Sequence, residues 1–442
     1  MMSTAAALRA QLVDVDKSPA ALESQMTPGS LKYPVLTLPN EITVEIFLHF
    51  VSLMRQVYYR RPQPYYGLLW LASVCQSWRA VTLSTCALWN DIVIVDCDGI
   101  RDVGQLLKVC LPRAGSLPLD LDIGLPEDNF SMDTIVSTLG LYGSQWRRIR
   151  LSSPGMPRIF PIDRFPSSLP LLECLTLSDL PVNDKPVSSL RHAPQLHELS
   201  LRNSSRTIQL GLPFNKLTKL DLSHFDIIEL LAVLPYTLNL ESLQLAIATK
   251  KTPVVPPSIL LPHLHTFKCR GDRPTIVLQY LTLPALERLV LLYPSDAGVH
   301  PILSCVARSG STIRTLDLIH LNFNAAYDFI CSLPTIRNLC LSFRSWSLGD
   351  QDRFFAAMIS GSCLPALESL TCKGCRPMRA DNLSAVISAR WRGVEGTTKL
   401  NSVSLDFDKE DSNTEFANSF DQLYELGRQG LKLEITGVGI TR

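Results

Sequence analysis

Two cysteines near the C-terminal end of the chain, Cys372 and Cys375, have the Cys-x-x-Cys spacing of many metal sites. Structural zinc takes four sulfur or nitrogen ligands in a tetrahedron, so such a pair is half of a site. No second pair of this kind occurs in the sequence, and no His pair lies near it. The favoured interpretation is that these cysteines pack as small hydrophobic side chains.

Two histidines, His263 and His265, alternate as a strand would display them. No carboxylate at a ligand-like spacing completes a set around them, so a structural role is favoured over a metal site. We therefore predict that the protein has no metal site and no cofactor.

Catalytic motifs are equally scarce. The segment from Gly437 to Gly439 lacks the third glycine and the following helix of a dinucleotide-binding fingerprint. The chain contains no Gly-x-Ser-x-Gly elbow and no His-Glu-x-x-His pair. A triad built from distant residues is defined by geometry alone, so sequence leaves it open. We expect no catalytic residues and a protein that is not an enzyme.

A basic cluster surrounds Ile149, where Arg147, Arg148 and Arg150 follow one another closely. In a strand, Arg148 and Arg150 point to the same side. Guanidinium groups bind phosphate and carboxylate oxygens well, so one hypothesis is recognition of a phosphorylated or acidic segment of a target protein. The alternative, a solvated basic rim with no ligand, is favoured.

Composition narrows the classes of partner. Lys and Arg number 42 against 41 Asp and Glu, which provides no broad positive field for nucleic acid or an anionic membrane. Nowhere do the roughly 18 consecutive apolar residues of a membrane span occur. The first apolar run is broken by Arg9, which argues against a secretion signal. The 12 scattered cysteines read as reduced thiols, so we expect a protein of the cytoplasm, the nucleus or both.

A short unit of the form Leu-x-x-Leu-x-Leu recurs along the chain after Asn90. The cysteines, histidines and arginines described above lie in or beside copies of this unit, so its structure decides where they point. Eleven copies begin at Trp146, Leu172, Leu196, Leu217, Leu240, Leu264, Leu286, Ile313, Ile336, Leu367 and Leu400. Successive copies start 21 to 33 residues apart, and most steps fall within the period of about 20–29 residues typical of leucine-rich repeats. The pattern resembles a leucine-rich-repeat array.

Each unit predicts one strand whose fourth and sixth positions enter the core while the third, fifth and seventh face solvent. Stacked units predict an α/β solenoid, with a parallel sheet on the concave face and helices and loops on the convex face. The charged residues at solvent-facing positions are candidates for target binding: Arg148, Arg150, Arg202, Lys219, Asp221, Lys268, Arg270, Arg288 and Asp317. Their mixed charge favours a protein target over nucleic acid.

Between the units, apolar residues recur with helical spacing mainly in the C-terminal half of the chain, which predicts helices there. The predicted convex helices lie around Leu303, Ile330, Phe355 and Val386. A last helix around Leu423 and an alternating strand from Leu431 to Ile435 predict a C-terminal cap. The Asn that commonly follows the strand of a leucine-rich repeat is rare, because Leu180, His224 and Cys375 stand near that place, so we expect an irregular array.

The chain divides into a leader at 1–34, a helical module at 35–90 and the array at 91–442. In the module, Ile42, Ile46 and Phe50 recur every four residues, which predicts a first helix. A second helix is predicted over 68–80. The prolines at Pro62 and Pro64 predict a loop between the two helices.

The module carries a composite motif: Leu38-Pro39-x-Glu41-Ile42-x-x-x-Ile46-Phe47, then Val74-Cys75-x-x-Trp78-Arg79, then Leu88-Trp89-x-x-Ile92. This order resembles the F-box-like domain of fungal F-box proteins, in which a following repeat array is common. The resemblance implies binding to the SKP adaptor of a cullin-RING ubiquitin ligase. The positions that match the family motif are Leu38, Pro39, Ile42, Ile46, Val74, Cys75 and Trp78.

Two hypotheses of function follow. In the first, the protein is a substrate-recognition adaptor of an SKP-cullin-F-box ubiquitin ligase, whose helical module binds the SKP adaptor and whose repeats bind an unknown target protein. In the second, the array is an interaction scaffold that works without the ligase, and the N-terminal helices only cap the first strand.

Overall fold

The computed structural model describes residues 38–58, 66–94, 102–125, 129–153, 164–179, 188–202, 212–248, 258–271, 273–292, 296–343, 346–374, 380–407 and 417–436. The predictions for the leader, for the proline-rich loop after Tyr58, for Cys375 and for the glycines at Gly437 and Gly439 lie outside these residues.

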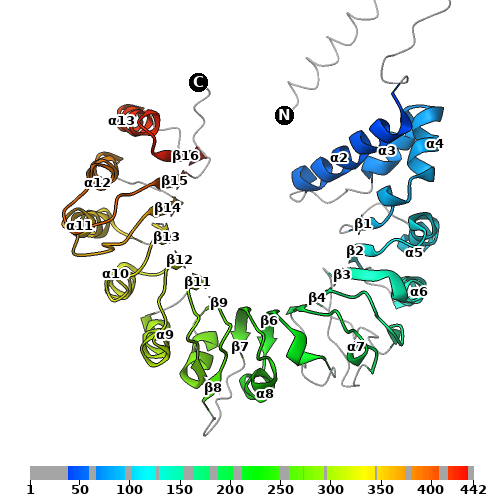
Figure 1. Ribbon diagram of the computed structural model, residues 1–442, viewed down its shortest axis with the longest axis horizontal. Helices are drawn as coiled ribbons and strands as arrows, with labels where there is room; N and C mark the ends of the chain where they lie inside the picture. Colours follow the sequence, from blue (N-terminus) through cyan, green and yellow to red (C-terminus); the bar gives the residue numbers. More distant parts are fainter. Residues whose placement is uncertain are drawn as a thin grey trace, which may run out of the picture.

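One parallel sheet of 14 strands runs through the described chain in sequence order, with β8 and β10 set apart as a pair of their own. Its strands are β1 (Asp91–Ile94), β2 (Leu119–Gly124), β3 (Trp146–Ser152), β4 (Cys174–Ser178), β5 (Glu198–Arg202), β6 (Lys219–Phe225), β7 (Ser242–Ala248), β9 (Thr266–Arg270), β11 (Arg288–Leu292), β12 (Thr315–Ile319), β13 (Asn338–Ser342), β14 (Ser369–Lys373), β15 (Ser402–Asp406) and β16 (Lys432–Thr436). The side pair is β8 (Ile259–Leu260) and β10 (Leu281–Thr282). The sheet bends into an arc whose inner side is lined by strands (Figure 1).

Most helices cover the outer side of the arc, and those of residues 40–84 lie at its N-terminal end (Figure 1). The helices are α2 (Asn40–Tyr58), α3 (Tyr66–Val74), α4 (Gln76–Ser84), α5 (Val103–Cys110), α6 (Asn129–Gly140), α7 (Ser188–Arg191), α8 (Ile227–Val233), α9 (Asp296–Ser309), α10 (Phe323–Cys331), α11 (Leu348–Ile359), α12 (Ala380–Arg392) and α13 (Ala417–Arg428). Short 3-10 helices occupy Cys86–Leu88, Leu111–Ala114, Gly143–Gln145, Phe214–Lys216, Leu234–Tyr236 and Arg273–Tyr280. Within the described residues, no helix combines the length and apolarity that a bilayer span requires.

The predicted α/β solenoid is confirmed. All eleven Leu-x-x-Leu-x-Leu units form strands, β3 to β7, β9 and β11 to β15, and the predicted last strand is β16. The inward positions are fully buried, as with Leu289 and Leu291 at 0 % exposure, and each such side chain contributes on the order of 1.5–3 kcal/mol to the stack. The predicted C-terminal helices are α9 to α13. Strands β1 and β2 and the helices α5 to α8 were not among the predicted elements.

A residue with a left-handed backbone follows the Leu-x-x-Leu-x-Leu unit in five repeats. These are Asp179 (φ 58°), His224 (φ 61°), Gly271 (φ 80°), His320 (φ 62°) and Gly374 (φ 58°), each two residues after the last position of its unit. Glycine, Asp and His tolerate this conformation better than branched residues do. The array is therefore regular in backbone geometry at a position where its sequence is irregular.

The N-terminal module packs onto the first strand of the array without a break in the apolar core. The buried residues Phe47 and Leu71 belong to the same cluster as Trp89 and Ile92. The second predicted helix is divided, because α3 ends at Val74 and α4 begins at Gln76. Cys75 is the N-cap of α4, and its Sγ accepts a hydrogen bond from the backbone N–H of Trp78 at 3.4 Å.

Candidate functional site

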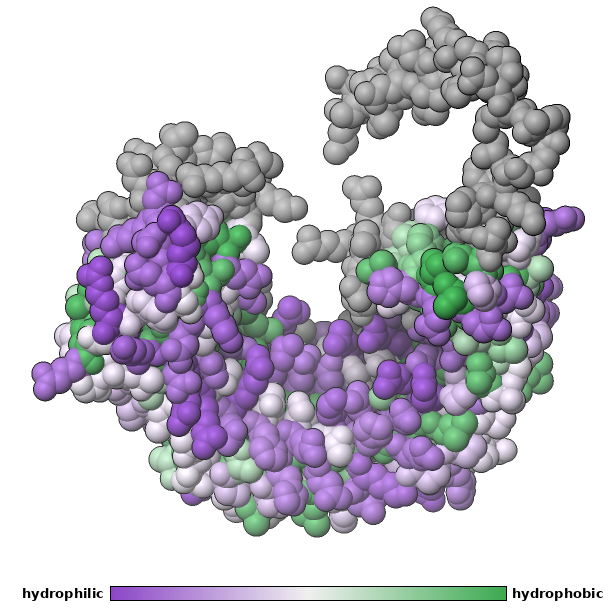
Figure 2. Space-filling view, turned by 45° about the horizontal axis from the view of Figure 1, so that its top comes forward, coloured by the Kyte–Doolittle hydropathy of each residue, from purple (hydrophilic) through white to green (hydrophobic). Residues whose placement is uncertain are grey.

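The concave surface is built from side chains that alternate with the buried leucines along each strand. All nine predicted target-binding residues occupy such positions, on β3, β5, β6, β9, β11 and β12. The parallel register brings them onto one sheet face. Figure 2 shows that mostly hydrophilic side chains line this inner face.

Carboxylates of neighbouring strands neutralise most of the basic groups on this surface. Arg150 pairs with Asp122 at 3.1 Å, and Arg147 binds Asp120 through Nε and Nη2 at 2.8 and 2.7 Å. The hydrogen bond to Asp120 raises the pKa of Arg147. Arg148 approaches Glu173 at 4.0 Å. The hypothesis that this cluster grips phosphate gains no support, because its guanidinium groups already face acids.

The same arrangement recurs further along the sheet. Arg202 donates to Asp221 Oδ2 from Nε and Nη2 at 3.1 and 2.8 Å, and Ser200 Oγ donates to the same oxygen at 3.0 Å. Arg288 pairs with Asp317 at 2.8 Å. These acids are only 18 % exposed, whereas their arginines are 52 % and 51 % exposed. The concave face thus carries a network of ion pairs between side chains of neighbouring strands.

Two hollows follow the centre of this face. One of about 230 Å³ is lined by Arg202, Lys268 and Arg270 together with the polar side chains of Ser223 and Gln244. A larger one of about 540 Å³ lies over β3 to β7 and includes Arg150 and Lys219. Within the described residues, Lys268 forms no ion pair. Its charge is therefore not already neutralised by an acid among the described residues, which suits it to an acidic group of a partner.

We expect the exposed pair of Arg202 and Asp221 to contribute little to folding. A double-mutant cycle with Arg202→Ala and Asp221→Ala should give a coupling of about 0.2–1 kcal/mol in urea unfolding, since solvent screens the arginine. A cycle that combines Arg202→Ala with Asp317→Ala, in a distant strand, should give additive changes. A coupling well above this range for the neighbouring pair would mean that the interaction is desolvated.

The second candidate surface lies on the N-terminal helices. Of the seven residues that match the family motif, five are exposed, among them Leu38 (37 %), Ile42 (48 %), Ile46 (46 %) and Val74 (60 %); Pro39 is exposed as well. Ile42 and Ile46 lie one turn apart on α2, on the side away from buried Phe47. Figure 2 shows hydrophobic side chains gathered at these helices. Helix α2 therefore has two apolar faces, a buried one that includes Phe47 and an exposed one that includes Ile42 and Ile46.

The other two motif residues have structural contacts. The ring of Trp78 packs edge-on against Phe47 with ring centroids 4.9 Å apart. Its Nε1 is buried and has no hydrogen-bond partner among the described residues. Cys75 caps α4. Both side chains are half-buried, so substitution of either would perturb the module as well as its surface.

Several exposed apolar residues on the same module were not predicted from the motif. They are Leu53, Leu69, Trp70 and Leu83, which are 41 % to 48 % exposed. Leu53 lies eleven residues after Ile42, which places it on the same side of α2, so helical periodicity could have found it. Trp70 and Val74, four residues apart, likewise lie on one side of α3.

No family model matches this chain, and a search of curated proteins finds no significant match. The resemblance to an F-box-like domain therefore rests on the motif residues themselves.

Proposed function

We propose that this protein is a substrate-recognition adaptor of an SKP-cullin-F-box ubiquitin ligase. In this proposal the N-terminal helices bind the SKP adaptor, and the concave face of the array binds a target protein. The protein itself catalyses nothing.

The observation that carries the proposal is the open apolar stripe of α2. Leu38, Ile42 and Ile46 are 37–48 % exposed, although Phe47 of the same helix is buried in the core that continues into the array. Exposed apolar patches on small helical modules commonly mark protein interfaces. An amphipathic helix that leaves one stripe open suits a partner made of helices. The stripe coincides with the residues that match the family motif, which is what supports the SKP adaptor as the partner.

The concave face supports the second half of the proposal. Its paired acids and bases, with Lys268 free of an ion pair among the described residues, offer a patterned surface rather than a uniform field. Such a pattern selects one protein surface and disfavours others through mismatched charges. We therefore expect a folded protein target rather than nucleic acid.

The alternative is an interaction scaffold that works without the ligase. The continuous core from Phe47 through Trp89 to Ile92 favours it, because helices joined in this way shield the first strand of the sheet. A cap, however, has no need for exposed apolar residues on its outer side. The two hypotheses therefore differ in what Ile42 and Ile46 do.

Binding to a purified SKP-type adaptor, alone and with the cullin amino-terminal domain, tests the proposal. We expect Ile42→Ala with Ile46→Ala in the full chain to cost at least about 2 kcal/mol of binding, a roughly thirtyfold rise in Kd. Both side chains are half exposed, so the thermal unfolding of the variant should match that of the parent.

The matched control is Ile228→Ala with Leu238→Ala, which removes two apolar side chains of 47 % and 55 % exposure elsewhere on the array. This variant should bind the adaptor as the parent does. If the parent does not bind, or if both double variants bind equally well, the ligase hypothesis fails and the scaffold hypothesis stands.

A further inference from the structure

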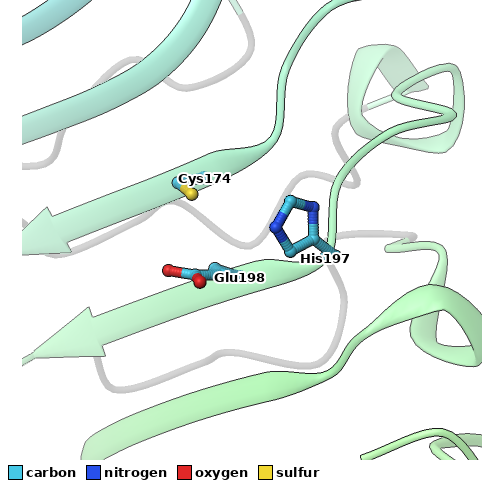
Figure 3. A group of neighbouring side chains, drawn as sticks. All are labelled: Cys174, His197 and Glu198. Atoms are coloured by element: carbon cyan, nitrogen blue, oxygen red, sulfur yellow. The ribbon is translucent and has the colours of Figure 1, made fainter.

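Three side chains of different chemistry converge where β4 and β5 begin. Cys174 opens β4, Glu198 opens β5, and these two residues are register partners in the sheet. His197 immediately precedes Glu198 in the chain. A thiol sulfur, an imidazole nitrogen and a carboxylate oxygen lie within 4.8 Å of one another, and Figure 3 shows the three side chains around one shared space.

The histidine ring is held in the orientation that a metal ligand needs. Its Nδ1 lies 2.9 Å from the carbonyl oxygen of Gln195. A carbonyl can only accept, so Nδ1 carries the proton and donates it. The proton-free Nε2 is then the coordinating atom, and histidine ligands of metals are commonly held through a backbone carbonyl in this way.

The carboxylate has two partners in the metal-free protein, Lys219 and the thiol of Cys174, which hydrogen-bonds to it. Lys219 donates to Oε1 of Glu198, which leaves Oε2 free of Lys219. Burial raises the pKa of Glu198, but the hydrogen bond and charge of Lys219, together with the hydrogen bond from Cys174, outweigh it, so the pKa is lowered and the group is ionised near neutral pH. The acid is therefore a carboxylate even without a metal ion.

We propose that Cys174, His197 and Glu198 form a binding site for Zn²⁺, with one sulfur, one nitrogen and one oxygen ligand. On binding, the thiol of Cys174 loses its proton to solvent and coordinates as a thiolate. Burial raises the pKa of the Cys174 thiol to about 11, so the metal ion has to displace this proton. Thiolate and carboxylate bring two negative charges to the ion. Glu198 shares its charge with Lys219 through Oε1, whereas Arg148 lies beside another acid, Glu173.

The set leaves a fourth tetrahedral position open. Cys174 and Glu198 line the hollow of about 540 Å³ on the concave face, so this position is accessible to water or to a donor atom of a bound protein. Three protein ligands with an open position differ from the four ligands of a closed structural zinc site. The inference does not depend on the ligase proposal, because it concerns only the ligands of this chain.

Cobalt titration of the reduced full-length protein tests the site, since tetrahedral Co²⁺ reports its ligands by absorption. We expect one equivalent to produce the d–d bands of a tetrahedral ion and a thiolate-to-cobalt charge-transfer band, all abolished by added Zn²⁺. Cys174→Ser should remove the charge-transfer band. His197→Gln should keep that band and raise the Kd for Co²⁺ at least about tenfold.

Matched controls are Cys340→Ser, at an outward position of β13, and His192→Gln, at an exposed position after α7. Both should bind Co²⁺ like the parent. Circular dichroism of every metal-free variant should match the parent, since none of these side chains is in the apolar core. The proposal is overturned if the parent binds no Co²⁺ at micromolar concentration, if bound Co²⁺ shows no thiolate band, or if Cys174→Ser and His197→Gln bind as the controls do.

Discussion

Replacing Arg390 by alanine should lower the free energy of unfolding by about 3–5 kcal/mol. The side chain is 0 % exposed. Its guanidinium donates to the carbonyl oxygens of Met358, Leu364 and Thr398 at 3.3, 2.9 and 3.4 Å. These carbonyls belong to α11 and to the loops before β14 and β15, so one side chain joins three segments of the convex layer.

The cost has two physical parts. Removing the side chain leaves a cavity, and it also leaves carbonyl oxygens buried without donors, each at about 1–3 kcal/mol. Burial lowers the pKa of Arg390 but leaves the guanidinium charged near neutral pH. Leu364 also has a left-handed backbone at φ 56°, a conformation that its contact with Arg390 helps to hold.

Urea unfolding followed by far-ultraviolet circular dichroism measures this effect. Arg392→Ala, an exposed arginine on the same helix, should change the free energy of unfolding by no more than about 0.5 kcal/mol. Arg390→Met preserves the stem and removes the donors, so it isolates the hydrogen-bonding part. If Arg390→Ala proved as mild as Arg392→Ala, the carbonyls would have to be satisfied by water.

Replacing Trp89 by alanine should destabilise the protein by about 3–5 kcal/mol, with the loss concentrated at its N-terminal end. The ring is 4 % exposed and joins the helical module to β1. Its Nε1 donates to the carbonyl oxygen of Thr82 at 2.7 Å, and Arg113 lies over its face at 5.3 Å from the ring centroid. Loss of the ring therefore removes packing, a hydrogen bond and a cation–π contact together.

Hydrogen exchange with mass spectrometry can locate this loss. We expect faster exchange in β1 and β2 and no change in β15 or β16, because repeat arrays respond mainly through neighbouring units. Trp70→Ala is the matched control, since Trp70 belongs to the same module but is 48 % exposed. It should leave exchange unchanged and, if the ligase proposal holds, weaken adaptor binding. Faster exchange at β16 after Trp89→Ala would contradict a local role for this residue.

These two tryptophans separate the proposed roles of the module. Trp89 is buried on the side that contacts the array, so its substitution tests whether the module stabilises the first strands. Trp70 faces outward, so its substitution tests whether the module binds a partner. A protein that needs Trp89 for stability and Trp70 for adaptor binding would use the module for both purposes. The adaptor and scaffold hypotheses then differ only in whether the outer face has a partner.

The two strands that the repeat pattern did not predict, β1 and β2, show where a search for the full unit fails. The segment Leu119-Asp120-Leu121-Asp122-Ile123 alternates buried and outward residues as strictly as the recognised units do. Pro118 stands where the first Leu of the unit would be, so a search for the full Leu-x-x-Leu-x-Leu unit does not find this strand. Its two acids are the partners of Arg147 and Arg150, and missing β2 therefore also hid the neutralisation of that basic cluster.

Sequence by itself determined the repeat, the alternation of inward and outward positions and the motif of the N-terminal helices. Each depends on spacing over a few residues, which local geometry converts directly into a face of a strand or helix. Only the tertiary structure decided which outward residues meet, because that depends on the register between strands about one repeat apart. Register pairs Arg202 with Asp221 and brings Cys174 to His197 and Glu198. Packing likewise decided that Trp78 and Arg390 turn inward while Ile42 and Ile46 remain open, since burial depends on what neighbouring elements leave uncovered.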